Sequence, residues 1–474
     1  MRANFTQTTL DLLRDYESRN VTFLDPDGTW PIVWERAKGC SVWDTSGRRY
    51  LDLTAAFGVA AAGHANPKVV LAGQQQMQRL LHAMGDVHPH ALKAELAREL
   101  SRLTFERWST RSGGRRPDPG SRARTPCRFE IGATADWNSE LQKGNPGHSA
   151  PHGKTVFCNS GFEAVEAALK TAHLATNKAG VLAFEGAYHG LGYGALTTTH
   201  RPLFRSPFRR QLREFARFAP FAASRRELPA VREAVEAALA TGRIGTVLVE
   251  PIQARGGIQI PPPGFLRMLR RACDQYGTLL VLDEIYTGFG RTGRWFACEH
   301  EAVIPDLICL GKALTGGFPL SACVGRADLM DAAWPASEGE ALHTSTFLGH
   351  PVGCAMALAQ LREIDHLRLC ERSATHGEEL LSLLKQLKAP GGLRFEVRGR
   401  GLMVGLEVRR SNRSPATEVV IAAVKRMLQR GFILLPEGEA ANVIGFTPPL
   451  TISSSQLART IQSLQEVLAS EVRP

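Results

Sequence analysis

The chain has 474 residues, of which 43% are hydrophobic and 22% charged, enough to bury a large core divided over two or more units. No apolar run approaches the roughly 20 residues that span a bilayer, and the first residues carry acids and no signal-peptide core, so we expect a cytoplasmic protein without a membrane segment. Nine scattered cysteines without C-x-x-C spacing argue against a disulfide framework and a zinc site, so no metal is expected.

The formal charge of +11 is concentrated in one stretch. Between Arg107 and Arg128, seven arginines stand against a single acid, Asp118, so this stretch supplies over half of the excess. It belongs to an insertion at about 106–152 that is rich in Gly, Pro and Ser and has few apolar residues, which predicts a flexible, solvated loop. Because no aromatic side chains are interleaved for base stacking, no nucleic-acid partner is expected.

From about residue 153, short apolar strands alternate with helical stretches, which predicts a mostly parallel, doubly wound sheet. The expected strands are 155–158, 181–184, 245–249, 279–282, 307–310 and 321–324, and the expected helices are 161–176, 229–241 and 264–276. After about residue 345 the pattern changes, which predicts a smaller α+β domain. Its expected elements are a helix near 351–387, strands near 395–399 and 402–408, and helices near 417–430 and 454–470.

Gly288, Gly290 and Gly293 match the G-x-G-x-x-G fingerprint of dinucleotide-binding proteins. That fingerprint requires a preceding strand, a helix that opens within it, and an acidic residue about 20 positions later. Only the strand is present, because the residues that follow have no helical period and soon meet Pro305. We therefore expect a mobile or tightly turned loop, and no NAD site.

The start of the helix predicted at 161–176 is a candidate phosphate site. Ser160 and Gly161 stand between a strand and this helix, and a helix N-terminus offers free N–H groups and the positive end of a dipole. The same serine is equally typical of an ordinary helix cap. After the next strand come Tyr188 and His189, which either stack on a planar ligand or pack in the core.

Two ionisable residues at later strand ends complete the pattern. Asp283 follows the strand at 279–282, where a buried carboxylate requires a cationic partner such as a protonated pyridine nitrogen. Lys312 follows the strand at 307–310, which favours a desolvated amine able to form a Schiff base, although most single lysines face solvent. A phosphate cradle, a stacking aromatic, a carboxylate and a poised lysine together match what pyridoxal phosphate requires.

A series of motifs runs in order along the chain: VWDTSGRRYLD, NSGFEAVEAALK, GAYHG, VEPIQ, DEIYTGFGRTG, LGKALTGG, HTSTFLGHP and VRGRGLMVGLE. Their wording and order resemble the class III (ω-type) aminotransferases, which are pyridoxal-phosphate enzymes of fold type I. The resemblance covers the chain except about residues 106–152. It implies an α/β fold with a large cofactor-binding domain at 91–345 and a small α+β domain at 346–474, and an N-terminal segment at 1–90 that packs with the small domain and the mouth of the site.

The resemblance also implies roles for individual residues. Lys312 would carry pyridoxal 5′-phosphate and move the proton during catalysis, and Asp283 would pair with the pyridinium nitrogen. Thr346 would reach the phosphate of a neighbouring subunit's cofactor, which implies a homodimer. The residues implied in cofactor binding are Ser160, Gly161, Phe162, Tyr188, His189, Glu250, Asp283, Ile285, Tyr286, Lys312 and Thr346.

Three residues are implied on the substrate side. Arg398 resembles the family's carboxylate clamp, since a guanidinium suits bidentate binding of a carboxylate. Phe57, close to the alanines at 60–62, indicates an apolar donor pocket. Arg255 stands where many relatives carry a glutamate, and we expect it either to form a replacement pocket for an anion or to face solvent.

Two further departures from the family bear on the chemistry. Tyr286 stands where the family often has glutamine, and its phenol could still hydrogen-bond the cofactor. Leu191 stands where members that act on 4-aminobutyrate and acylornithine often have an arginine for a distal carboxylate. The leucine argues against those substrates.

These observations predict a transaminase that takes an amino group from a primary-amine or ω-amino/diamino donor and passes it to a 2-oxo acid, pyruvate or 2-oxoglutarate. The same scaffold could instead carry decarboxylation-coupled transamination or an aminomutase reaction, because the side chains that orient the substrate decide which bond breaks. An inactive, anion-binding homologue is the least favoured alternative, since Lys312, Asp283 and Thr346 are all intact.

Overall fold

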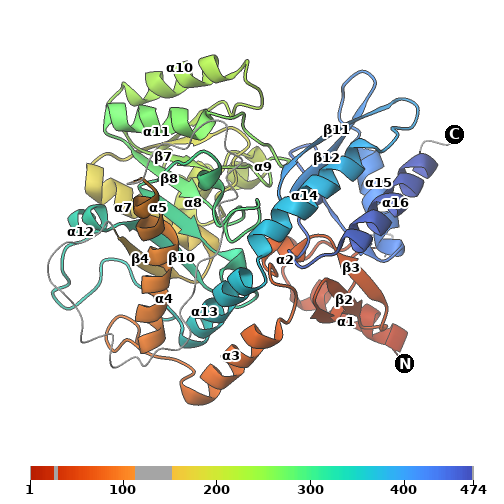
Figure 1. Cartoon of the computed structure of the whole chain (residues 1–474), viewed down its shortest axis with the longest axis horizontal. Helices are drawn as coiled ribbons and strands as arrows, with labels where there is room; N and C mark the ends of the chain where they lie inside the picture. The colour runs from red at the N-terminus through yellow and green to blue at the C-terminus, as the bar shows by residue number, and fades with distance from the viewer. Residues whose placement is uncertain (1, 26–29, 113–151, 472–474) are drawn as a thin grey trace.

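The computed structural model describes residues 2–25, 30–112 and 152–471, so most of the basic insertion predicted at about 106–152 lies outside the described residues. Two lobes lie side by side in Figure 1. One is built on a seven-stranded sheet, and the other consists of the C-terminal strands and helices, drawn in blue, with the N-terminal strands, drawn in red, against it.

The large sheet has the strand order β4-β10-β9-β8-β7-β5-β6. Its strands are β4 (Gly153–Cys158), β5 (Gly180–Phe184), β6 (Ala216–Ala219), β7 (Ile244–Val249), β8 (Leu279–Asp283), β9 (Leu307–Leu310) and β10 (Ser321–Arg326). The pairs from β6 to β9 are parallel, and β10 runs antiparallel to both of its neighbours. The mostly parallel sheet and its six expected strands are confirmed, whereas β6, a short edge strand that is only partly buried, was not predicted.

Helices cover both faces of this sheet, because alternate side chains along each strand point to opposite faces. Val281 of β8 packs in the cluster with α7 (Gly161–Thr176) and α12 (Ala327–Ala333). Leu280 and Leu282 pack in the other cluster, with α10 (Leu228–Leu239), α11 (Phe265–Tyr276) and α4 (Ala91–Ser101). This is the doubly wound arrangement that the alternating pattern predicts, and α7 has the bounds expected for it.

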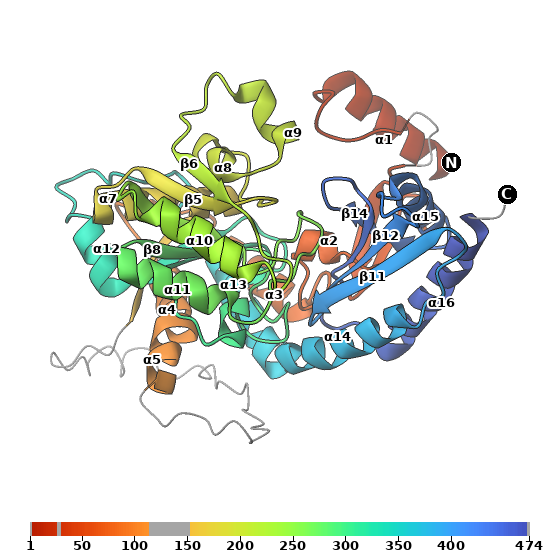
Figure 2. The same cartoon turned by 90° about the horizontal axis from the view of Figure 1, so that it is seen from above.

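The second lobe contains a sheet of order β11-β12-β15-β14, and Figure 2 shows α14 running along β11 and β12. Its elements are β11 (Leu393–Arg400), β12 (Met403–Arg410), β14 (Leu435–Glu437), β15 (Val443–Phe446), α14 (Leu369–Lys385), α15 (Thr417–Gln429) and α16 (Ser454–Glu471). A third sheet joins the N-terminal β1 (Trp34–Lys38), β2 (Ser41–Asp44) and β3 (Arg49–Asp52) to β13 (Phe432–Ile433), which runs parallel to β3. The N-terminal strands are thus hydrogen-bonded to the C-terminal part of the chain.

The single helix expected at 351–387 is wrong, because the structure has two helices there. α13 (Pro351–His366) ends at His366, and Leu367 is its C-cap. Arg368 then takes a φ of 52°, and no glycine or proline in the sequence indicates this turn. α13 packs on α3 (Pro67–Arg79) and α4, whereas α14 packs on β11. The domain boundary at 345/346 stays a prediction. Further helical elements of the described residues are α1 (Arg2–Tyr16), α2 (Ala55–Gly58), α8 (Tyr193–Thr198), α9 (Pro202–Arg205), η3 (Ser206–Phe208) and η4 (Ala297–His300).

The predicted start of the flexible insertion at about residue 106 needs correction. The chain continues as helix through η1 (Arg102–Glu106) and α5 (Arg107–Ser112). Arg107 and Trp108 are buried, and both contact the carboxylate of Glu299. The Trp108 ring also packs edge-on against two phenylalanine rings. A buried ion pair and an aromatic cluster order these residues, so Arg107 is not part of a solvated basic loop.

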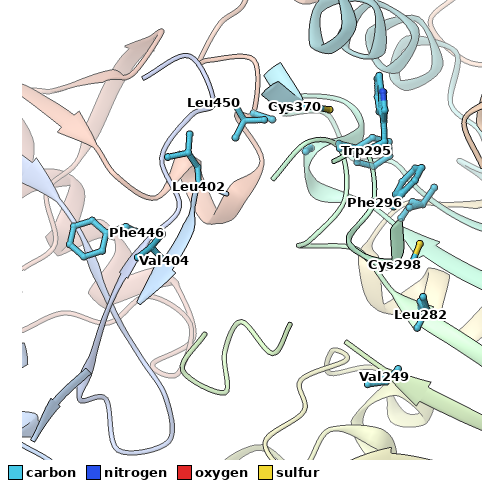
Figure 3. Close-up of a cluster of buried hydrophobic side chains, with 14 of the residues drawn as sticks. Val249, Leu282, Trp295, Phe296, Cys298, Cys370, Leu402, Val404, Phe446 and Leu450 are labelled. Atoms are coloured by element: carbon cyan, nitrogen blue, oxygen red, sulfur yellow. The ribbon is translucent and has the colours of Figure 1, made fainter. Parts of the chain in front are cut away.

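A continuous apolar core joins the two lobes. Figure 3 shows side chains of the large sheet, such as Leu282, and of the loop that carries Trp295, in the same cluster as Leu402 and Phe446 of the second lobe. The glycine-rich loop 288–293 lies within this core and is tightly turned, since Arg291 is buried and donates to the carbonyls of Leu402 and Pro448. Within the described ranges, no cluster of side chains could hold a metal ion and no helix combines the length and apolarity needed to cross a bilayer.

Candidate active site

A cavity of about 670 Å³ opens at the carboxyl ends of β5, β7, β8 and β9. Parallel strands bring these ends to one edge of the sheet, where open α/β folds bind ligands. All the residues predicted for cofactor binding line this cavity except Ser160 and Thr346. The other lining residues are Phe57, Gly190, Leu191, Phe204, Ala254 and Arg255.

Lys312 begins the short turn η5 (Lys312–Leu314) directly after β9 and has a φ of 40°. A non-glycine residue in the left-handed region is uncommon, and such strain clusters at functional sites. Its Nζ lies 4.6 Å from the centroid of the Tyr286 ring. Burial lowers the pKa of Lys312, and Asp283 and Glu250 oppose this by stabilising the ammonium. The amine is therefore easier to deprotonate than that of a surface lysine, as a nucleophile requires.

Asp283 and His189 form a buried pair on the cavity wall. His189 Nδ1 lies 2.8 Å from Asp283 Oδ2, and the backbone N–H of Ile285 donates to Oδ1 at 3.1 Å. His189 Nε2 is buried and has no hydrogen-bond partner among the described residues. Buried polar atoms in proteins normally have partners, so this orphaned nitrogen fits a ligand that presents a polar group beside the aspartate.

The N-terminus of α7 forms another part of the site. Ser160 is the N-cap of α7, yet its side chain makes no capping hydrogen bond. Ser160 Oγ is buried and has no partner within the described ranges, while the serine carbonyl accepts from Ser321 Oγ at 2.6 Å. The first N–H groups of a helix lack intrahelical partners and attract anions. Of the two readings of Ser160, phosphate ligand or ordinary cap, this geometry favours the phosphate ligand.

Two tyrosines line the cavity. The backbone N–H of Tyr188 donates to Glu250 Oε1 at 2.9 Å, and its ring packs edge-on against Phe204 at 5.5 Å. Burial raises the pKa of Glu250 to about 7, although His189 stabilises its carboxylate. The hydroxyl of Tyr286 lies 3.1 Å from Thr447 Oγ1, so the phenol is held by the second lobe.

Arg255 lies on the cavity wall with 33% of its side chain exposed. Its Nη1 is 3.5 Å from Glu437 Oε2, and the guanidinium donates no hydrogen bond to any described residue. Burial raises the pKa of Glu437 to about 7, and Arg255, Arg201 and Lys312 act against this. Arg255 was expected either to form a pocket for an anion or to face solvent, and the structure places it on the cavity wall. Its guanidinium has donors that could bind a carboxylate.

Arg398 does not line the cavity, and each of its three side-chain nitrogens already donates a hydrogen bond. Nη1 bonds to Glu407 Oε2 at 2.5 Å, Nη2 to the carbonyl of Gly257 at 2.7 Å, and Nε to the carbonyls of Gly257 and Ile258. Arg398 therefore anchors the loop that follows Arg255, and its predicted role as carboxylate clamp stays a prediction.

Phe57 lines the cavity, whereas Thr346 does not. Phe57 reaches the cavity from α2 and is 52% exposed. Thr346 is exposed and lies outside the cavity of its own chain, beside the exposed Phe347.

Sequence reasoning missed Glu437 and Thr447, which lie behind Arg255 and Tyr286. Both come from the last part of the chain, and each reaches its partner across the boundary between the lobes. The short strand β14 (Leu435–Glu437) carries no motif that marks its carboxylate. No local signal in the sequence could have found these contacts.

The residues present fit pyridoxal phosphate. A lysine of lowered pKa, a buried carboxylate, an unpartnered serine hydroxyl at a helix N-terminus and tyrosines on the wall are the groups that this cofactor uses. Together with the mostly parallel sheet and the second α+β lobe, they define a pyridoxal-phosphate enzyme of fold type I.

Comparison with known sequences identifies the family. The family model for class III aminotransferases matches residues 24–112 and 128–468, so the interior segment outside the resemblance shrinks to 113–127. Acetylornithine aminotransferase of Methanosarcina mazei is 33% identical and covers 96% of each chain. 5-Aminovalerate aminotransferase DavT of Pseudomonas aeruginosa is 34% identical and covers 92% of this chain and 93% of its own. The chain belongs to the class III aminotransferases; it is a transaminase, and its cofactor is pyridoxal phosphate.

Solved structures agree with this assignment. The ornithine aminotransferase of Toxoplasma gondii ME49 has a TM-score of 0.77 and 25% identity, covering 98% of this chain and 95% of that chain. An (S)-enantioselective ω-transaminase of Thermomicrobium roseum has a TM-score of 0.81 and 25% identity over 99% of both chains. No comparison favours the decarboxylating, aminomutase or inactive alternatives.

Proposed function

We propose that Lys312 and Asp283 are the catalytic residues of this transaminase. The observation that carries the proposal is the buried cluster in which Lys312, the Asp283–His189 pair and the unpartnered Ser160 hydroxyl meet at one edge of the sheet. Bound pyridoxal phosphate supplies an electron sink for the substrate carbon. Lys312 Nζ would hold the cofactor covalently and would carry the proton to and from that carbon. Asp283 would hold a proton on the ring nitrogen, and His189 keeps the Asp283 carboxylate in place.

We infer a donor with a terminal primary amine on a short aliphatic chain, and a 2-oxo acid as acceptor. Three similar aminotransferases are named for acetylornithine, 5-aminovalerate and putrescine. Each of these compounds has a terminal primary amine on an aliphatic chain. Phe57, Leu191 and Phe204 supply apolar surface along the cavity for the aliphatic chain. Arg255 binds the carboxylate of pyruvate or 2-oxoglutarate, because its guanidinium faces the cavity with unused donors.

The first experiment is the visible spectrum of the purified protein with pyridoxal phosphate, before and after borohydride, with peptide mapping of the reduced product. We expect a band that disappears on reduction and a pyridoxyl group on Lys312. Incubation with each 2-oxo acid and with putrescine, which has no distal carboxylate, or with 5-aminovalerate or N-acetylornithine, which have one, then tests the donor class and the expectation drawn from Leu191. A label on another lysine contradicts the role of Lys312, and carbon dioxide release during amino transfer would reopen the decarboxylating alternative.

We further propose that the protein is a homodimer in which Thr346 reaches the partner's cofactor phosphate. Exposed apolar side chains in two segments of the chain support this proposal. Leu81 and Met84 lie in the segment after α3, and Phe347 follows Thr346 directly. They lie together, because the His82 ring packs against Phe347 at 5.4 Å. A patch of this kind on a protein surface commonly marks an interface.

Analytical ultracentrifugation tests the dimer. Met84→Glu places a charge on the apolar patch, so we expect monomers, whereas Thr346→Ala leaves the dimer intact and weakens cofactor binding. A monomeric unaltered protein that binds cofactor fully would contradict the proposal. The proposed location is the cytoplasm, a reducing compartment, because the described cysteines are buried and form no disulfide with one another.

A further inference from the structure

A left-handed turn at the edge of the cavity is the most strained feature of the described backbone near the site. Ala55, Ala56 and Phe57 have φ values of 47°, 48° and 62°, and Gly58 follows at 82°. Left-handed backbone is disfavoured for L-residues, because Cβ approaches the following carbonyl oxygen, and such residues normally occur singly. A run of three that ends in a cavity-lining side chain requires specific support.

Asp52 supplies that support. Its side chain is fully buried, and Oδ1 accepts from the backbone N–H and the hydroxyl of Thr54 at 2.7 and 2.6 Å. Oδ2 accepts from the Ala56 N–H at 3.1 Å and lies 2.7 Å from His64 Nε2. One carboxylate thus holds the start and the middle of the turn, and His64 holds the carboxylate.

The turn connects to the catalytic lysine through Tyr286. A Cβ on Gly58 would lie 2.9 Å from Tyr286 Cε1, so the ring packs directly on this glycine. The same ring lies 4.6 Å from Lys312 Nζ. Figure 1 shows α2, which contains the turn, between the two lobes. Movement of the turn therefore moves both Phe57 at the cavity and the ring beside Lys312.

The second lobe holds the turn and the tyrosine together. Thr447 Oγ1 lies 3.1 Å from the hydroxyl of Tyr286 and 3.2 Å from the carbonyl oxygen of Thr54. The backbone N–H of Thr447 also donates to the carbonyl of Leu53 at 2.8 Å. The N-terminal segment, the second lobe and the large sheet thus meet at one hydrogen-bonded point.

We propose that Asp52, supported by His64, is a positioning residue that keeps the turn 55–58 left-handed and so sets the donor specificity of the transaminase through Phe57. The inference rests on the proposed function, because Phe57 selects a substrate only if the cavity binds one. Asp52 contacts neither substrate nor cofactor in this scheme. Its effect passes through the backbone of the turn and through the Tyr286 ring.

The test compares Asp52→Asn with the unaltered holoenzyme. The amide oxygen can keep the contacts with Thr54, but the amide nitrogen then faces the Ala56 N–H, a donor facing a donor. We expect the KM for 5-aminovalerate to rise about tenfold as the strained turn relaxes, with a smaller change in kcat. The pH midpoint of the bound cofactor's absorbance should also shift, because Tyr286 moves relative to Lys312.

Two further variants separate positioning from simple loss of stability. Ala56→Gly in the Asp52→Asn background should restore KM and the absorbance midpoint, because glycine adopts positive φ without steric cost. In a Phe57→Ala background, Asp52→Asn should leave KM nearly unchanged if Asp52 acts through Phe57, since effects along one path are not additive. Full additivity in this cycle would overturn the inference.

Asp44 offers a matched control in the neighbouring strand. It is also buried, and its carboxylate accepts from the backbone N–H groups of Ser46 and Arg48 and from the Tyr50 hydroxyl. Asp44→Asn should lower the free energy of unfolding, measured in urea, without moving KM or the absorbance midpoint. If Asp52→Asn behaves in the same way, Asp52 is only structural and the inference is wrong.

The absorbance midpoint keeps this inference separate from the proposed donor class. If the unaltered protein does not convert 5-aminovalerate, the proposed donor is wrong, yet the midpoint can still be measured without turnover. A midpoint that shifts in Asp52→Asn, returns in the double variant with Ala56→Gly and stays fixed in Asp44→Asn supports the positioning role. An unmoved midpoint in all three variants overturns it.

Discussion

The two sides of the cavity are built in different ways. The proposed cofactor side takes Asp283 and Lys312, which line the cavity, and Ser160, which precedes the lining residue Gly161, from the carboxyl ends of strands in a single sheet, each within a short motif. The substrate side brings Phe57 and Arg255, with Glu437 behind, from an N-terminal turn, a loop after β7 and the strand β14. Residues of the first side are placed by their own strands, whereas those of the second depend on contacts between distant segments. Substitutions on the first side should therefore stop the reaction, and those on the second should change its substrate.

Replacement of Lys312 gives the largest expected effect. Lys312→Ala removes the amine that binds the cofactor and carries the proton, so kcat should fall by roughly 10⁴-fold or more. The yellow colour and the borohydride-dependent label should disappear together. Lys154→Ala is the control, since Lys154 is an exposed lysine that pairs with Asp331 on the protein surface. Appreciable turnover by Lys312→Ala would show that the reaction does not depend on the Lys312 amine.

Replacement of Asp283 should have the next largest effect. Asp283→Asn keeps the shape but removes the charge that holds a proton on the ring nitrogen, so kcat should fall by about 10²–10³-fold. Asp306 is a matched buried aspartate, which pairs with Arg270 and Arg326 away from the cavity. Asp306→Asn should reduce the free energy of unfolding in urea and leave kcat unchanged. Equal kinetic effects in the two variants would contradict the assignment.

The arginine pair tests the substrate side. Arg255→Ala should raise the KM for the 2-oxo acid by roughly 10–100-fold, because it removes charge-assisted hydrogen bonds to a carboxylate. Arg398→Ala should instead lower the free energy of unfolding by about 2 kcal/mol, since it removes one charged hydrogen-bond partner of the buried Glu407 carboxylate, which keeps Arg409 and Asn442. Steady-state kinetics and urea unfolding of both variants distinguish the roles. The reverse result would return the clamp to Arg398.

The smallest expected effect concerns pH. The pKa of Glu437 is raised from 4.5 to about 7 by burial, so between these values the folded protein binds more protons than the unfolded protein. The free energy of unfolding of the cofactor-free protein should therefore fall as the pH rises from about 5 to 7. Glu437→Gln should reduce this fall by on the order of 1 kcal/mol.

The control for this prediction is Glu439→Gln, because Glu439 is exposed and only two positions away. Burial also raises the pKa values of Glu250 and Glu284 to about 7, so part of the slope should remain in Glu437→Gln. A slope that Glu439→Gln reduces as much as Glu437→Gln would assign the effect to general surface charge.

Most of the large sheet and the cofactor side could be predicted from the sequence. Buried parallel strands appear as short apolar runs, and a ligand residue that follows such a run lies at the sheet's carboxyl edge whatever the rest of the chain does. Ser160, Asp283 and Lys312 were found in this way. The break between α13 and α14 could not be predicted, because Arg368 adopts a positive φ and arginine is not a residue type that favours it.

The amino-acid sequence alone determined the class of enzyme, its cofactor and the residues proposed to act on that cofactor, since each belongs to a local motif. Our proposal of Arg255 rather than Arg398 as the carboxylate clamp depended on the tertiary fold, because the hydrogen-bond partners of both arginines are set only by folding. The contacts of Asp52 with the turn and of Thr447 with Tyr286 also come from folding. These side chains are far apart in the sequence and come into contact only when the lobes pack together. The spacing of residues in the sequence therefore cannot predict such contacts.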